Sequence, residues 1–499
     1  MPARLAFAFA RLVRWAWSAV VRFDFSHSAA RTRRSRFGAP RMPRRTGILL
    51  TAGVAALVAA ARADVIIDWN NVAIDAVRAT GGPPCPIARA FAMTHVAMYD
   101  AVNSIERTHY PYHVMLDAPP GTSRVAAAAA AGQRVLSHLF PQQLDVFDAA
   151  LQGSLAGVPD GAGERNGIVL GRMVADAIIA LRAGDGSNAP EGFEFGSDPG
   201  DYVPTPPDFT QPPFNPEWGR LKPWTMNTGA MFRPPLPPAL SSAEYAAALN
   251  EVKELGRRDS TTRTQEQTQI AWFWANDRDG TFKPPGQLNH LTQVVAQQQG
   301  NTLAENARLF ALVNLALAEA GIVAWDAKYD MSVQFWRPVT GVRQADRDDN
   351  PDTAADPNWL PLGDFTPPFP AYISGHATFA AAHAAVMAKF YGRDEIEFTI
   401  GTDEPIVRDV KRTFRSFSDA ARENGLSRIY LGVHWRFDFE EAYKAGTSVG
   451  QYVADSYLTK LPQAEPPDPL ALLCGNGLLG AFPLMAAGLV GARRRRRGG

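Results

Sequence analysis

A serine, a glycine and a histidine stand at the start of an alanine-rich stretch, "SGHATFAAAHAAVMAKFYG", at residues 374–392. Ser374 is a natural helix N-cap, Gly375 lets another group approach the backbone, and the N–H groups of a first helical turn carry the positive end of the helix dipole. Such a helix end suits an anion, beside which His376 could donate or accept a proton. Taken alone, the segment is equally consistent with an N-capped helix and an incidental histidine.

Two other segments, one before and one after this stretch, supply cations. Lys328 and Arg337 lie in "AWDAKYDMSVQFWRPVTGVR", and Arg428 lies in "SRIYLGVHWRFD". If the segments converge, these side chains surround a tetrahedral oxyanion, because each guanidinium fork can bind two of its oxygens. The Ser374 hydroxyl and the Gly375 N–H would complete the anion site. A solvated surface cation is the alternative for each of them alone.

The last segment also contains a second histidine, His434, and Asp438. Of the two histidines, one could attack or coordinate the central atom and the other could handle protons. Asp438 follows His434 by four residues, which we interpret as one helical turn. Its carboxylate can then accept the N–H of the imidazole and leave the other ring nitrogen free to bond.

Together the three segments resemble the superfamily of type 2 phosphatidic acid phosphatases, bacterial acid phosphatases and vanadium-dependent haloperoxidases, whose pattern is K-x6-R-P, P-S-G-H and S-R-x5-H-x3-D. The third segment matches in full, from Ser427 to Asp438. In the second, Ile373 stands where proline is usual. In the first, eight residues instead of six separate Lys328 from Arg337. The sequence therefore leaves open whether Lys328 reaches the oxyanion.

Within this superfamily "FWRP", "PPFPAYISGHATF" and "LGVHWRFD" are most similar to vanadium chloroperoxidases. The resemblance implies a vanadate cofactor with His434 as the axial ligand of vanadium, and phosphate can occupy the same site. It implies a catalytic set of His376, His434 and Asp438. The oxygen binders that it implies are Lys328, Arg337, Ser374, Gly375 and Arg428. Trp325 and Phe369 match aromatic positions on the halide side of the pocket.

The leading hypothesis is a haloperoxidase-like enzyme that acts on hydrogen peroxide, a halide and a small organic acceptor. The alternative is a soluble acid phosphatase that cleaves a phosphate ester through a phosphohistidine at His434, since a site for vanadate also resembles the transition state of phosphoryl transfer. A third reading is a cell-surface protein that binds oxyanions without turnover. Membrane-embedded lipid phosphatases fit poorly, because the body lacks the several apolar runs of about 20 residues that they need.

Helical periodicity dominates the chain and predicts an all-α fold. We expect two four-helix-bundle-like halves, 64–185 and 241–460, joined by a long Pro-rich crossover at 186–240. Ser241 and Glu244 predict a capping box. No segment predicts a sheet. The predicted helices span 86–104, 123–139, 141–155, 164–182, 241–257, 263–276, 302–327, 374–391, 404–423 and 439–458.

The zero net charge of the 499 residues hides a basic chain end on each side of an acidic body. Residues 1–63 hold 12 arginines and one acid, and residues 466–499 hold five arginines and one acid. Removing these from 50 basic and 50 acidic residues leaves 33 and 48 in the body, a net of −15. Such a body argues against nucleic acid as a partner, because a phosphate-binding surface needs clustered Lys and Arg.

Both chain ends predict targeting. Residues 1–63 are interpreted as an extension followed by a secretory signal that starts at Met42 and ends in the small-residue pattern before Asp64. Residues 461–499 combine a Pro-rich spacer, an apolar stretch and five arginines, and they resemble the PEP-CTERM sorting signals of bacteria. These features predict an exported protein, periplasmic, secreted or at the cell surface of a bacterium, with transient membrane attachment through the tail. The two cysteines, Cys85 and Cys474, do not predict a disulfide framework.

Overall fold

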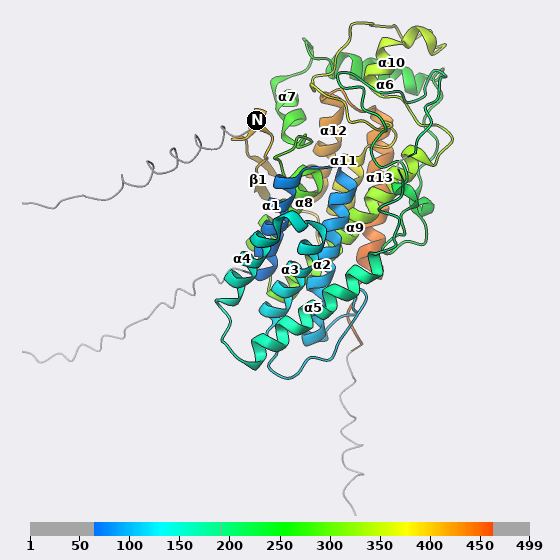
Figure 1. Cartoon of the computed structure of the whole chain (residues 1–499). Helices are drawn as coiled ribbons and strands as arrows, with labels where there is room; N and C mark the ends of the chain where they lie inside the picture. The colour runs from blue at the N-terminus through cyan, green and yellow to red at the C-terminus, as the bar shows by residue number, and fades with distance from the viewer. Residues whose placement is uncertain (1–63, 191, 463–499) are drawn as a thin grey trace, which may run out of the picture. The chain divides into compact units, whose positions relative to one another are not determined.

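The computed structural model describes residues 64–190 and 192–462. In these ranges thirteen α-helices and two short strands form the fold (Figure 1), so the prediction of an all-α protein is confirmed. The first helices are α1 Val65–Thr80, α2 Pro84–Glu106, α3 Arg124–Leu139, α4 Leu144–Leu155 and α5 Ala162–Arg182. The later elements are α6 Ala243–Leu255, α7 Gln265–Phe273, α8 Lys283–Gln299, α9 Leu303–Tyr329, α10 Pro338–Arg343, α11 Gly375–Tyr391, β1 Phe398–Ile400, β2 Arg412–Phe414, α12 Phe417–Tyr430 and α13 Arg436–Ser456.

Helix α9 is the central element. It packs against α2, α11 and α13. From Leu309 to Tyr329 every one of its residues is buried, which explains why it is apolar all round. By length and composition it is the one helix in the described part of the chain that could cross a membrane. However, 94% of its most apolar window is buried inside the protein, as in a core helix.

Small residues set the spacing of the neighbouring helices. Residues Ala126–Ala131 of α3 have no exposed surface, and α5 packs closely on them. A Cβ atom at Gly171 of α5 would lie only 2.2 Å from the Ala127 carbonyl oxygen.

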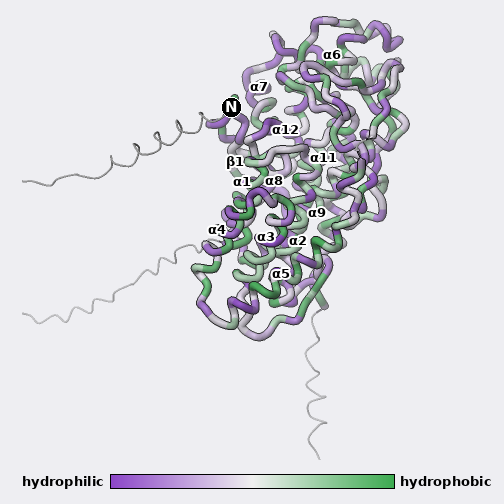
Figure 2. Tube along the Cα trace, viewed as in Figure 1, coloured by the Kyte–Doolittle hydropathy of each residue, from purple (hydrophilic) through white to green (hydrophobic). Residues whose placement is uncertain are grey.

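In Figure 2 hydrophobic stretches follow the helices, whereas the loops around α6 carry much of the hydrophilic colour.

The connection between α5 and α6 contains no α-helix among its described residues, only two short 3₁₀ turns. It is nevertheless anchored, because Trp218 and Trp224 are buried and the Arg182 guanidinium lies 4.1 Å above the Trp224 ring. The division of the body at 185 and 241 stays a prediction.

Several sequence-based boundaries were wrong. The helix predicted at 404–423 begins only at Phe417, after the N-cap Ser416, whose hydroxyl accepts from the Asp419 N–H at 3.1 Å. The preceding residues form a two-stranded antiparallel ribbon, in which Phe398 faces Phe414, although no sheet was predicted. Three residues per strand are too few for an alternating pattern to be recognised.

Three helices were missed and one cap was misplaced. Helices α1, α8 and the six-residue α10 were not predicted; α8 begins with Pro284 and Pro285 in its first turn and is rich in polar residues. The capping box assigned to Ser241 is also wrong, because Ser242 is the N-cap of α6 and its hydroxyl accepts from the Tyr245 N–H at 3.2 Å. The predicted signal, the tail from residue 463 onward and Cys474 lie outside the described residues.

Candidate active site

The N-terminus of α11 has the predicted cap. Ser374 is the N-cap, its hydroxyl lies 3.4 Å from the Ala377 N–H, and its carbonyl accepts the first intrahelical bond, from the Thr378 N–H at 3.0 Å. The N–H groups of Gly375 and His376 come before this bond and so have no partner within the helix. A Cβ atom at Gly375 would lie 3.2 Å from the Trp325 ring, a tight contact that glycine avoids.

Helices α11 and α13 run parallel, with their N-termini side by side. Gly446 and Gly450 of α13 pack against the carbonyls of Thr378 and Ala382, where a Cβ atom would lie 2.3 Å from each oxygen. The later residue of α11, Ala382, thus contacts the later glycine of α13, as expected for parallel helices. Near the start of both helices, the Ser374 N–H donates to the Asp438 carbonyl at 3.1 Å. The positive ends of two helix dipoles therefore meet at one place, which favours an anion there.

His434 and Asp438 make the predicted contact, but not through a helical turn. Helix α13 begins at Arg436, so His434 lies before it. Asp438 reaches back from the first turn, and its Oδ2 accepts from the Trp435 N–H at 3.1 Å and from His434 Nδ1 at 2.8 Å. One carboxylate therefore caps the helix and orients the imidazole, in the manner of a capping box.

The His434 imidazole is held neutral. Burial lowers its pKa well below the usual value, and the charges of Arg337, Lys328 and Arg428 act in the same direction. Because Nδ1–H donates to Asp438, Nε2 carries the lone pair, and it accepts from Arg337 Nη1 at 3.0 Å. A neutral Nε2 with a fixed orientation is the nitrogen that can bind an electrophilic centre.

Arg337 is fully buried beside this nitrogen. Its Nε donates to the Phe369 carbonyl and its Nη1 donates to the Val433 carbonyl, both at 2.8 Å. Its Nη2 has no hydrogen-bond partner among the described residues. Burial lowers the pKa of Arg337 to about 10, so the guanidinium stays charged at neutral pH.

Lys328 also lies at the site, but its donors are taken. Its Nζ donates to the carbonyls of Pro370, Ala371 and Ile373 at 2.8, 2.9 and 2.5 Å. The two extra residues of the first motif do not separate it from Arg337, because Lys328 Nζ and Arg337 Cζ lie 5.1 and 4.7 Å from the same Phe369 ring. Lys328 thus fixes the backbone that leads into α11, and its binding of an oxyanion stays a prediction.

Arg428 lies in the last turn of α12 and has a partner that the sequence analysis missed. Its Nη2 donates to Asp277 Oδ2 at 2.8 Å, while Nε and Nη1 are buried without a partner in the described parts of the chain. Asp277 lies 151 residues away, in the loop after α7, and nothing in the sequence pairs the two. The turn after Arg428 contains Gly432 with φ of 83°, a conformation that suits glycine, and it returns the chain to His434.

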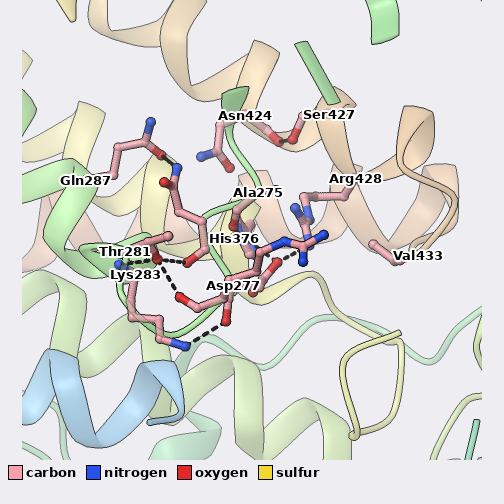
Figure 3. A network of polar contacts seen from close by, with 12 residues as sticks. Ala275, Asp277, Thr281, Lys283, Gln287, His376, Asn424, Ser427, Arg428 and Val433 are labelled. Atoms are coloured by element: carbon pink, nitrogen blue, oxygen red, sulfur yellow. Dashed lines mark hydrogen bonds and ion pairs between the residues drawn. The ribbon is translucent and has the colours of Figure 1, made fainter. Parts of the chain in front are cut away.

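The loop that holds Asp277 is itself tightly bound (Figure 3). Lys283 Nζ donates to the Asp277 carbonyl at 2.6 Å and pairs with Asp279 at 2.7 Å. Thr281 Oγ1 donates to the Asn276 carbonyl at 2.9 Å, and Asn276 is fully buried with a φ of 43°. A non-glycine residue in this conformation needs such support, so the loop positions Asp277 rigidly.

His376 lies next to Asp277 and Arg428, and Figure 3 shows the three side chains close together. Its Nε2 lies 3.1 Å from the Ala275 carbonyl and 3.9 Å from Asp277 Oδ2. Nε2 therefore carries the proton of the neutral ring, and Nδ1 is the acceptor. Burial and the charge of Arg428 lower the pKa of His376 to about 4, against the opposite effect of Asp277.

The two aromatic residues of the predicted halide pocket are in contact. The ring centroids of Trp325 and Phe369 are 4.9 Å apart. Trp325 Nε1 donates to the Phe214 carbonyl at 3.1 Å, and the Phe214 N–H donates to the Pro368 carbonyl at 2.9 Å. Phe214 of the Pro-rich crossover therefore bonds both to Trp325 and to Pro368, the residue before Phe369.

These side chains fit an oxyanion. Buried guanidinium nitrogens of two arginines have no partner among the described residues, and the N-termini of α11 and α13 point the same way. No group of three or more His, Cys, Asp or Glu side chains in the described ranges could instead hold a bare metal cation. The structure brings the predicted site residues together in this one place.

Known proteins resemble this chain over most of its length. A family model described as the VCPO second helical-bundle domain matches residues 308–461. Vanadium chloroperoxidase of Curvularia inaequalis is 31% identical to this chain over 488 residues of alignment. The alignment covers 75% of this chain and 78% of that protein.

Solved structures resemble it as well. The structure described as the first bacterial vanadium-dependent iodoperoxidase has a TM-score of 0.69 at 25% identity, covering 80% of this chain and 98% of that one. A holo-type bacterial vanadium-dependent chloroperoxidase has a TM-score of 0.62 at 18% identity, covering 76% and 93% respectively, and so supports the fold alone.

Proposed function

Since the chain belongs to the vanadium chloroperoxidase family, we propose that it oxidises halide with hydrogen peroxide at a vanadate bound to His434. The observation that carries the proposal is the neutral, oriented Nε2 of His434 among buried arginine N–H groups that lack partners in the described chain. A small organic molecule would accept the oxidised halogen.

Vanadate, when bound, would supply the electrophilic centre that activates hydrogen peroxide toward a halide. His434 Nε2 would bind the vanadium, and Asp438 would keep the Nδ1 proton in place. Arg337 and Arg428 would bind vanadate oxygens with their unpaired nitrogens. The Gly375 N–H, with the Ser374 hydroxyl, would add donors at the start of α11. Because these donors are already fixed, little reorganisation would be needed when charge changes at the site.

His376 would handle the proton. It is neutral at pH 7, because its pKa is lowered to about 4, and its Nδ1 can accept a proton while Nε2–H stays on the Ala275 carbonyl. A bound oxyanion would raise this pKa, since an opposite charge nearby favours the protonated form. His376 would thus be able to take a proton from peroxide and return it later.

The halide would approach beside Trp325 and Phe369. Both rings are buried, and Lys328 and Arg337 lie over the Phe369 ring. An apolar wall backed by cations suits a large, weakly hydrated anion such as iodide or bromide. Lys328 would act mainly by holding the loop that carries Phe369, since burial lowers the pKa of Lys328 well below its usual value.

Export and processing of the tail also belong to the proposal, supported by the sequence patterns before Asp64 and after Lys460. Mass spectrometry of the native protein from its cells would give both ends of the mature chain. A chain that starts before Met42 and remains in the cytoplasm would contradict this part.

The decisive experiment uses the purified chain with and without orthovanadate. We expect peroxide-dependent oxidation of iodide and bromide only after vanadate is added, and no activity in His434→Ala. Hydrolysis of p-nitrophenyl phosphate by the vanadate-free protein, with vanadate acting only as an inhibitor, would instead identify an acid phosphatase. Absence of halide oxidation above the His434→Ala level with iodide, bromide and chloride would refute the proposal.

A further inference from the structure

A second cavity lies far from the oxyanion site. It has a volume of about 230 Å³ and is lined by α2, the first turns of α9, Phe390 of α11 and the segment around Lys460. Arg308 projects into it from α9, whose other end carries Lys328. Twenty residues of helix separate the two, about 30 Å along the axis. The cavity is therefore distinct from the oxyanion site.

The cations of this cavity lack carboxylate partners. Arg308 Nε donates to the Leu458 carbonyl at 2.8 Å, and its guanidinium lies 5.3 Å above the Phe390 ring. Neither Arg308 nor Lys460 forms an ion pair with any described residue. Burial lowers the pKa of Arg308, and the Tyr99 phenol opposes this only in part. A half-buried arginine without a counter-ion is an unusual feature, because desolvation of a charge is costly.

The acids that line the same cavity are already engaged. Glu305 caps its own helix, where Oε2 accepts from the Thr302 N–H and hydroxyl, each at 2.8 Å. Glu106 pairs with Arg124. Arg124 thus neutralises Glu106, whereas Glu305 keeps its negative charge. Arg308 and Lys460 together outweigh Glu305 by one positive charge at the cavity.

The pKa of His109 reflects the positive charge of Arg308 and Lys460. His109 lies beside Lys460 through an antiparallel bridge, supported by the bond from the Tyr110 N–H to the Thr459 carbonyl at 2.8 Å. Burial together with Arg308 and Lys460 lowers the pKa of His109 to about 4. The histidine is therefore neutral at pH 7, while the bridge fixes Lys460 at the wall of the cavity.

We propose that this cavity binds a small organic carboxylate. The two outer nitrogens of Arg308 match the two oxygens of a carboxylate, and Lys460 adds a second positive charge. Val102, Ala304 and the Phe390 ring supply an apolar wall for the carbon body of the ligand. Because the charge of Glu305 offsets one of the two cations, the cavity suits a ligand with one negative charge better than a dianion such as phosphate.

The test measures binding of benzoate to the full purified chain by titration calorimetry and saturation-transfer NMR. We expect a dissociation constant of about 1 mM or lower. Arg308→Gln should weaken binding at least tenfold, Arg308→Lys should weaken it less, and Lys460→Ala should weaken it about threefold. Arg172→Gln, an exposed arginine on α5, is the matched control and should bind like the unaltered chain.

Further experiments test whether benzoate binds in this cavity and not at the oxyanion site. Benzoate binding should persist in His434→Ala and in saturating vanadate, because neither touches the cavity. Inorganic phosphate should bind more weakly than benzoate. No benzoate binding at about 10 mM, unchanged binding in the Arg308 variants, displacement by vanadate, or tighter binding of phosphate would each overturn the proposal. Should Arg308→Gln fail to fold, Arg308→Lys and the exposed-site variant Lys460→Ala decide the outcome.

Discussion

Replacing Asp438 by asparagine separates the stability of the fold from the binding of an oxyanion. The carboxylate is fully buried, and its Oδ2 accepts from His434 Nδ1 and the Trp435 N–H. Burial raises its pKa from 3.8 to about 7, although Lys328 and Arg337 act in the opposite direction. An amide of the same shape can keep both hydrogen bonds but carries no charge.

The expected change in stability depends on pH. Because the folded-state pKa of Asp438 is the higher one, the free energy of unfolding falls as pH rises from about 4 to about 7. At about 1.4 kcal/mol per pKa unit, this lowers the stability of the unaltered chain by roughly 4 kcal/mol. The amide avoids that cost but loses the charge assistance of two hydrogen bonds, about 1 kcal/mol each. Asp438→Asn should therefore match the unaltered chain at pH 4 and be about 2 kcal/mol more stable at pH 8.

Oxyanion binding should change in the other direction. A neutral partner on Nδ1 makes Nε2 a poorer ligand, and loss of such a contact typically weakens binding 10- to 100-fold. Urea unfolding at pH 4, 6 and 8 and titration with vanadate at pH 8 measure the two effects. Asp455→Asn, exposed at the far end of α13, is the control. The reasoning fails if Asp438→Asn is destabilised equally at all pH values or binds vanadate like the unaltered chain.

Four further substitutions test other contacts. Lys328→Met should destabilise the fold by about 3 kcal/mol or more, since three buried carbonyls lose their donor. Thermal unfolding measures this, and an unchanged melting temperature would contradict it. Trp325→Phe removes one hydrogen bond and should change the KM for halide several-fold while the affinity for vanadate stays constant. Asp277→Asn should move the pKa of His376 below about 4, because the carboxylate is the charge that raises it; an unchanged NMR titration would contradict this. Lys283→Met should reduce kcat/KM about tenfold through the loosened loop, with vanadate binding as the second readout, and equal kinetics would argue against the positioning role.

The sequence by itself determined the features that depend on a few neighbouring residues. The cap of α11 is one, because Ser374 reaches an N–H group only three residues away. The contact between His434 and Asp438 is another, although its form as a cap and not a helical turn was misjudged. The apolar periodicity of amphipathic helices such as α5 was also readable, since its buried residues recur on one helix face.

Only the tertiary structure decided which distant groups meet. The pairing of Arg428 with Asp277 spans 151 residues, and the bonds from Lys328 to the loop before α11 span 42 to 45. The parallel arrangement of α11 and α13 follows from close contacts at Gly446 and Gly450 that no local pattern reveals. The physical reason is the range of the forces: a cap or a helical face involves neighbours within one turn, whereas a buried ion pair depends on where the whole chain packs.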